Sequence, residues 1–336
     1  MPKIIFRPTP IPRPPFPPPT PVSGALTFTA KQNGCRIGYI YYSEDYAVQD
    51  AGLNIEYSLD GGNTWLTYNM STNEAGAQMI ELNNGESVLF RGNNANLAYY
   101  LDDEDDYQAT KFVIEGQMAA SGDITSLLNG VGGMLNVPTY CFAYMFSGCT
   151  SLTQAPTLPA KTLAVKCYVS MFYGCSSLTQ APSLPATTLA NDCYVYMFQG
   201  CTSLTQAPAL PATTLANNCY TGMFNGCTSL TKAPALPATT LANSCYNYMF
   251  SGCTSLTQAP TLPATTLVNG CYNRMFNNCS LLAHIEALFT TTPGTNYTNG
   301  WVNGVAQNGT FVKSSEATWD VSGVNGIPVG WTVTTK

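Results

Sequence analysis

Apolar side chains recur along the middle of this chain at a fixed interval of 26 residues. One unit, residues 217–242, reads NNCYTGMFNGCTSLTKAPALPATTLA. A fixed period of this length predicts a solenoid, in which each unit buries its apolar face against its neighbours. The recurring columns are Cys141 to Cys271, Cys149 to Cys279, Met145 to Met275, Phe146 to Phe276, Leu152 to Leu282 and Leu163 to Leu267.

Within each unit the pattern predicts a short helix, a left-handed residue and a short strand. In the unit above, residues 219–224 are the predicted helix, capped by the preceding asparagines, with Cys219 and Met223 on one face. Gly226 follows at the position where helices often end in a left-handed residue. Residues 228–231 are the predicted strand, which ends before two prolines.

The segments on either side of the repeats have strand-like patterns. Apolar and polar residues alternate in residues 26–30 and 35–42, and Asp60-Gly61-Gly62-Asn63 separates two apolar runs as a hairpin turn would. Short strands at this spacing predict a β-sandwich. After the repeats the period breaks, and residues 291–336 hold three of the four tryptophans, which predicts a small β cap.

Composition narrows the possible functions. Only 10% of the residues are charged and the net charge is -6, so we expect no nucleic-acid partner. No apolar run approaches the roughly 20 residues of a membrane span, so we expect none. Twelve of the thirteen cysteines, all but Cys35, are spaced C-x7-C within the units, unlike the close pairs of zinc sites. We expect free, buried thiols that pack as small apolar groups.

Residues 1–21 hold ten of the 23 prolines, together with Lys3, Arg7 and Arg13 and no acidic residue. This composition is typical of extended polyproline II, either as a disordered linker or as an arm that anchors the protein on an acidic partner. The segment has no apolar region of the kind found in secretory signals. We therefore expect a virion protein whose arm binds other virion proteins.

Five adjacent acidic residues form a second unusual segment, at residues 102–106. A solvated loop tip is the simpler interpretation. The alternative is a weak calcium site, because carboxylate oxygens are the ligands that calcium prefers. Its candidate ligands are Asp102, Asp103 and Asp105.

The units MFxGCTSLTQAPxLPATTLA resemble BspA-type leucine-rich repeats. The segments YSLDGGNTW, LFRGNN and SGDITSLL, and the ending WVNGVAQNGTFVK with GIPVGWTV, are similar to the flanking modules of such proteins in gut anaerobes and their phages. The resemblance implies adhesion or surface display. The expected fold is multidomain: a proline-rich arm (1–21), an all-β sandwich (22–118), an α/β leucine-rich-repeat solenoid (119–290) and a β cap (291–336).

No constellation of catalytic residues stands out, and we expect no enzymatic activity, cofactor or metal. The single histidine, His284, follows the last repeat, and the block from Cys141 to Leu282 contains only one acid, Asp192. The positions that vary between units are instead amide, hydroxyl and aromatic residues, which suit a glycan or protein ligand. The candidate recognition residues are Tyr173, Tyr196, Gln199, Asn225, Tyr248 and Arg274.

The combined expectation is a non-enzymatic, fibre-type virion protein that forms a homo-oligomer and recognises a host-surface glycan. The alternative is a BspA-like adhesin of the bacterial cell surface. A neutral surface that is merely solvated also remains open.

Overall fold

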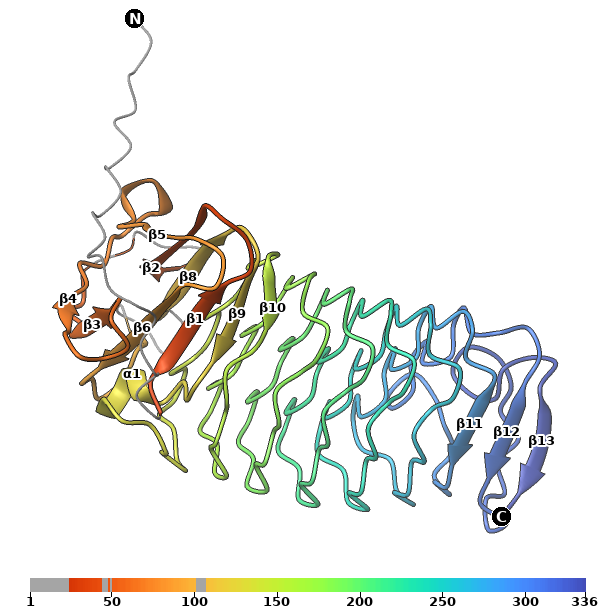
Figure 1. The fold of residues 1–336 in the computed structure, drawn as a ribbon. Helices are drawn as coiled ribbons and strands as arrows, with labels where there is room; N and C mark the ends of the chain where they lie inside the picture. Colours follow the sequence, from red (N-terminus) through yellow and green to blue (C-terminus); the bar gives the residue numbers. More distant parts are fainter. Residues whose placement is uncertain (1–23, 44–47, 49, 101–106) are drawn as a thin grey trace, which may run out of the picture.

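The computed structural model describes the whole chain except residues 1–23, 44–47, 49 and 101–106. The described residues form an elongated molecule with a two-sheet module at one end, a row of stacked coils in the middle, and a small parallel sheet at the other end (Figure 1). We call each 26-residue turn of the chain around the stack a coil.

Two sheets make up the N-terminal module. The first has six strands in the order β10-β9-β1-β6-β3-β4, and the second has four in the order β5-β2-β8-β7. The strands of the first are β1 (Leu26–Ala30), β3 (Ile55–Ser58), β4 (Leu66–Thr67), β6 (Ser87–Gly92), β9 (Met118–Ser121) and β10 (Leu152–Gln154). Those of the second are β2 (Cys35–Tyr42), β5 (Ile80–Leu82), β7 (Tyr99–Tyr100) and β8 (Tyr107–Glu115).

The alternating segments at residues 26–30 and 35–42 are β1 and β2, as predicted. The predicted hairpin is also confirmed, because β3 and β4 pair antiparallel around residues 60–63. The turn at residues 83–85 connects the two sheets, since β5 pairs with β2 whereas β6 pairs with β1. A 3₁₀ turn (Glu74–Gly76) and a single short helix, α1 (Ser126–Asn129), complete the described elements of this module.

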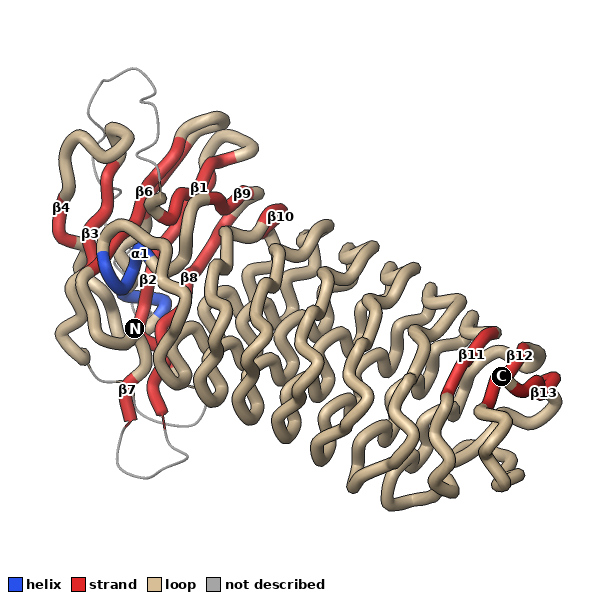
Figure 2. Tube along the Cα trace, turned by 90° about the horizontal axis from the view of Figure 1, so that it is seen from below, coloured by secondary structure: helices blue, strands red, loops and turns tan. Residues whose placement is uncertain are grey.

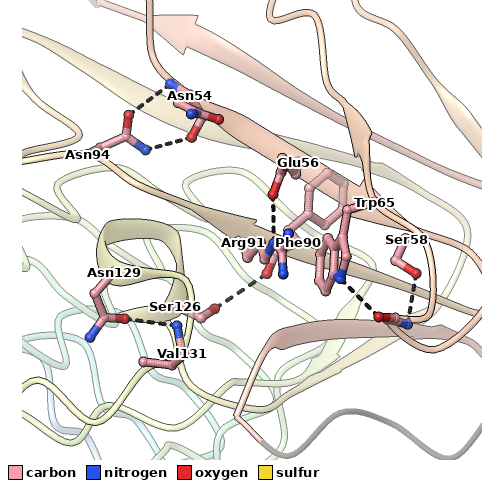
Figure 3. A network of polar contacts seen from close by, with 11 residues as sticks. Asn54, Glu56, Ser58, Trp65, Phe90, Arg91, Asn94, Ser126, Asn129 and Val131 are labelled. Atoms are coloured by element: carbon pink, nitrogen blue, oxygen red, sulfur yellow. Dashed lines mark hydrogen bonds and ion pairs between the residues drawn. The ribbon is translucent and has the colours of Figure 1, made fainter.

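Polar contacts hold the outer part of the six-stranded sheet together (Figure 3). Arg91 on β6 donates to Glu56 on β3 at 2.6 Å, and its guanidinium lies 4.0 Å from the ring centre of Trp65. Ser126 at the start of α1 donates to the carbonyl of Phe90 on β6. The sheet and α1 are therefore tied by side chains as well as by apolar packing.

The core of the two-sheet module runs without interruption into the coils. Phe112 on β8 stacks on Phe146 of the first coil with ring centres 5.5 Å apart, and Phe146 stacks on Phe172 at 5.2 Å. The amide of Phe112 donates to the carbonyl of Met145 at 2.8 Å, just as the amide of Phe146 donates to Met171 at 2.8 Å. Strand β8 thus supplies the layer on which the first coil rests.

The predicted helix in each unit is wrong. Residues 219–224 form successive tight turns, and Figure 2 shows the coils between β10 and β11 as loop. Alternate amides close these turns, such as Met223 to the carbonyl of Tyr220 at 3.2 Å. The amides between them donate to the next coil, such as Phe224 to Met249 at 2.9 Å.

The physical reason is the spacing of the coils. Packed helices need about 8–10 Å between their axes. The phenylalanine rings of neighbouring coils, from Phe146 to Phe276, have centres only 5.2–5.9 Å apart and planes within 6° of parallel. One helix per coil does not fit this spacing, whereas flat turns that hydrogen-bond to the next coil do. The α component of the expected fold class is therefore absent from the coils that the structure describes.

The strand predicted at residues 228–231 corresponds to residues 150–153 of the first coil, where the structure has a strand at Leu152–Gln154, β10. In later coils it is reduced to single bridges, such as Gln206 with Lys232 and Gln258 with His284. The first coil has the same prolines but pairs with β9, which has none, whereas each later coil faces another coil with prolines, and each proline removes an amide donor from the ladder. The asparagines expected to cap helices bond across coils instead: Oδ1 of Asn217 accepts from the amide of Asn243 at 3.2 Å.

The repeated residues stop near residue 290, as predicted, but the backbone register of the coils continues beyond that point. The amide of Phe276 donates to Trp301 at 2.8 Å, so Trp301 takes the position 26 residues after Met275. Strand β12 (Thr310–Lys313) begins 26 residues after β11 (His284–Ala287) and pairs with it in parallel. Backbone hydrogen bonds maintain this register. They form whatever the side chains are, so the register continues where the repeated cysteines and phenylalanines are absent. Strand β13 (Thr332–Thr335) then adds to β12.

Candidate recognition surface

One side of the stack is built from tight turns whose backbone is the same in every coil. We call it the turn face, and it consists of residues 140–148 and their equivalents at steps of 26 up to residues 270–278. Every fourth residue in it has a positive φ, in three columns that begin at Tyr140, Tyr144 and Gly148. The predicted left-handed position is confirmed, because Gly226 has φ 72° and its asparagine equivalent, Asn278, has φ 59°.

The structure brings the six predicted recognition residues together on this face. Tyr173, Gln199 and Asn225 are successive members of one column. Tyr196, Tyr248 and Arg274 belong to a second column, three residues earlier in the coil, in which Gly222 stands between the two tyrosines. A turn hydrogen bond joins the columns, from the amide of Gln199 to the carbonyl of Tyr196 at 3.1 Å.

Two of these tyrosines are well exposed, Tyr173 at 43% and Tyr196 at 37%. The ring of Tyr196 lies over Gly222 of the next coil, where an added Cβ would come within 2.3 Å of it. The guanidinium of Arg274 donates to the hydroxyl of Tyr248 at 2.6 Å and lies 5.3 Å from its ring centre. These contacts pack Tyr196 and Tyr248 against the neighbouring coil.

The turn face also contains an apolar patch that sequence reasoning did not assign to the site. Tyr140, Ala143 and Val169 form a small cluster separate from the main core, with Tyr144 and Val195 packed against it. Val195 precedes Tyr196, so this patch adjoins the predicted residues. Its only sequence signal is the variation between units at these positions, such as Ala143, Val169, Val195 and Thr221.

Two other groups of predicted residues cannot be placed. The anchoring residues Lys3, Arg7 and Arg13 and the calcium candidates Asp102, Asp103 and Asp105 lie outside the described residues. Among the residues that the structure describes, no group of three or more His, Cys, Asp or Glu side chains could hold a metal ion. His284 begins β11 and is half-buried, and Glu286 pairs with Lys336 at 2.8 Å.

The thiols of the coils are buried, as predicted, and all thirteen cysteines are free. Burial raises the pKa of Cys227 to about 12, and the same desolvation raises the pKa of Cys271 to about 11. Because the thiolate is the reactive form, these groups are poor nucleophiles near neutral pH. Their role is structural, and the turn face is the part of the stack that varies.

Comparison with known families matches the coils to one repeat type. A model of the BspA type leucine rich repeat region matches six copies, over residues 138–257 and 170–292. No curated protein and no solved structure matches the chain. Among the described residues, no helix is long and apolar enough to cross a membrane.

Proposed function

We propose that this chain, whose residues 138–292 are BspA-type leucine-rich repeats, is a non-enzymatic surface protein of the adhesion type. In this proposal the repeats form one continuous solenoid, and its turn face binds a glycan on a target cell. The observation that carries it is a fixed backbone with variable side chains, on which Tyr173 and Tyr196 are exposed.

The chemistry of the turn face suits a neutral ligand. Tyrosine rings offer apolar area to the C–H faces of sugars at low entropic cost, and the amides of Gln199 and Asn225 can bond sugar hydroxyls. The shared backbone hydrogen bonds hold these side chains on a rigid surface. Weak contacts of this kind gain strength through copy number, so we propose a homo-oligomer.

Replacing the exposed aromatics tests the role of the turn face. We expect Tyr173→Ala and Tyr196→Ala together to lower binding to a glycan microarray about tenfold or more, because each ring loses a stacking contact. Thr213→Ala, at an exposed position outside the turn face, is the matched control. A folded double variant that binds like the unmodified protein would exclude the turn face as the recognition surface.

We propose that the chain is displayed on a virion, with residues 1–21 as the anchor. The composition of this segment supports that placement, because ten prolines are typical of extended arms and three cations suit an acidic partner. The alternative is an adhesin of the bacterial cell surface, which the repeat family suits equally well.

Deleting residues 1–21 separates the two placements. We expect the shortened protein to fold normally and to be absent from purified particles, measured by immunoblotting against a known capsid protein. Reversing the charges with Lys3→Glu, Arg7→Glu and Arg13→Glu should weaken incorporation in the same direction. Detection of the full chain on bacterial cell envelopes without particles would instead support the adhesin.

A further inference from the structure

A hollow of about 660 Å³ opens between two adjacent coils, away from the turn face. Its walls come from residues within 231–237 and 257–263. These segments correspond, at steps of 26, to β10 in the first coil and to β11 after the last. The volume lies in the range of about 300–1,000 Å³ that is typical of small-ligand sites.

Prolines explain why space remains here. One coil further along, the amides of Ala259 and Leu262 donate to the carbonyls of His284 and Glu286, each at 2.9 Å. The equivalent amides at the hollow, Ala233 and Leu236, make no hydrogen bond to another residue that the structure describes. Prolines on both walls cannot donate, whereas residues 283–288 contain none. The two coils are therefore not joined by a ladder at this point.

The hollow also carries an unusual charge. Lys232 lies in its wall and is exposed. The equivalent position is glutamine in four of the other coils, at Gln154, Gln180, Gln206 and Gln258, and histidine in the last, at His284. Residues 231–263 contain no aspartate or glutamate, and Lys232 forms no ion pair with any described residue. A positive charge thus stands uncompensated beside unpaired backbone donors.

We propose that this hollow binds an acidic saccharide. The ammonium of Lys232 and the amide of Ala233 bond the anionic group, because charge-assisted hydrogen bonds are the strongest available to such a site. The amide of Gln258 and the hydroxyls of Thr231 and Thr257 reach sugar hydroxyls, and proline rings cover the C–H faces. The site is separate from the turn face, so it does not depend on the function proposed above.

Binding of defined probes to the full chain tests this site. Calorimetry would compare trigalacturonic acid, a sulfated disaccharide and neutral maltotriose. We expect both acidic probes, or the one whose anion fits, to bind about tenfold or more tightly than the neutral one. The two acidic probes separate a carboxylate ligand from a sulfate or phosphate ligand. Equal affinity for acidic and neutral probes, or no binding of any probe, would overturn the proposal.

Two variants separate a specific site from general attraction of anions. Lys232→Gln introduces the residue that four of the other coils carry and should lower acidic-probe affinity about tenfold. Lys232→Gln with Thr240→Lys keeps the net charge, places the lysine at an exposed position outside the hollow, and should lose the same affinity. Unchanged affinity in either variant, with an unchanged urea midpoint, refutes the proposal. Tyr196→Ala should leave acidic-probe binding intact, which keeps this result independent of the turn face.

Discussion

In the series of cysteines from Cys149 to Cys279, each thiol is a hydrogen-bond donor as well as an apolar group. Sγ of Cys201 donates to the carbonyl of Phe172 at 3.1 Å, and its equivalents donate to the preceding coil, or to Phe112 of β8 in the case of Cys149, at 3.0–3.2 Å. Among small side chains, cysteine combines this weak donor with the volume that the core requires. This explains a cysteine at every repeat in a protein whose thiols are all free.

Removing one such thiol tests this explanation. We expect Cys201→Ala to lower the free energy of unfolding by about 1–2 kcal/mol, because it leaves a cavity and removes one hydrogen bond. Urea denaturation followed by circular dichroism measures the change. Thr202→Ala, at the exposed neighbouring position, is the control. Equal midpoints for the two variants would mean that the thiol contributes no more than an exposed side chain does.

At the scale of elements, the stacked aromatic rings of the coils need a side chain that covers each end of the stack. Phe112 of β8 performs this role at one end, and Trp301 performs it at the other. Trp301 is fully buried, contacts the rings of Phe276 and Tyr272, and donates from its indole to the carbonyl of Gly326 at 2.9 Å. One side chain therefore joins the last repeat to the C-terminal segment.

Truncating this tryptophan should loosen that end of the stack. We expect Trp301→Ala to cost about 3–5 kcal/mol, since it removes a large buried side chain. Hydrogen exchange should rise first in the adjacent coil, residues 270–278, whereas residues 166–174 should change little because coils contact only their neighbours. Uniform loss of protection along the stack would show instead that the coils unfold as one unit.

At the scale of the whole molecule, the buried thiols link stability to pH. Desolvation raises the pKa of Cys149, Cys219, Cys227 and Cys279 to about 12, from an ordinary value of 9.0. Below pH 9 the thiols are protonated in both the folded and unfolded chains, so their full contribution to stability is present. As the pH rises from about 9 toward 12, the unfolded chain releases protons that the folded chain retains.

We therefore expect the free energy of unfolding to fall steeply above about pH 9, by up to about 1.4 kcal/mol per pH unit for each such thiol. Urea midpoints at about pH 7, 8.5 and 10 measure this dependence. The Cys201→Ala variant should show a shallower slope, because burial also raises the pKa of Cys201. A midpoint that stays constant up to about pH 10 would contradict the link.

The sequence alone determined which side chains face inward, because stacked units must place equal residues on equal residues. The interval of 26 and the buried columns follow from that rule, and the left-handed position at Gly226 follows from the ease with which glycine adopts a positive φ. The hydrogen-bond partners of the backbone amides could not be predicted in this way. The apolar spacing of residues 219–224 suits a helix. Alternate amides in this segment donate to carbonyls of the next coil instead, because neighbouring coils lie so close together.

The two ends of the stack were decided by tertiary structure for the same reason. Phe112 lies in an ordinary alternating strand, and Trp301 lies where the repeated residues stop. Neither residue type therefore indicates that its position belongs to the stack. Both join the stack through backbone hydrogen bonds to Met145 and Phe276. A backbone ladder depends on register and not on residue type, and register becomes visible only when the coils are placed side by side.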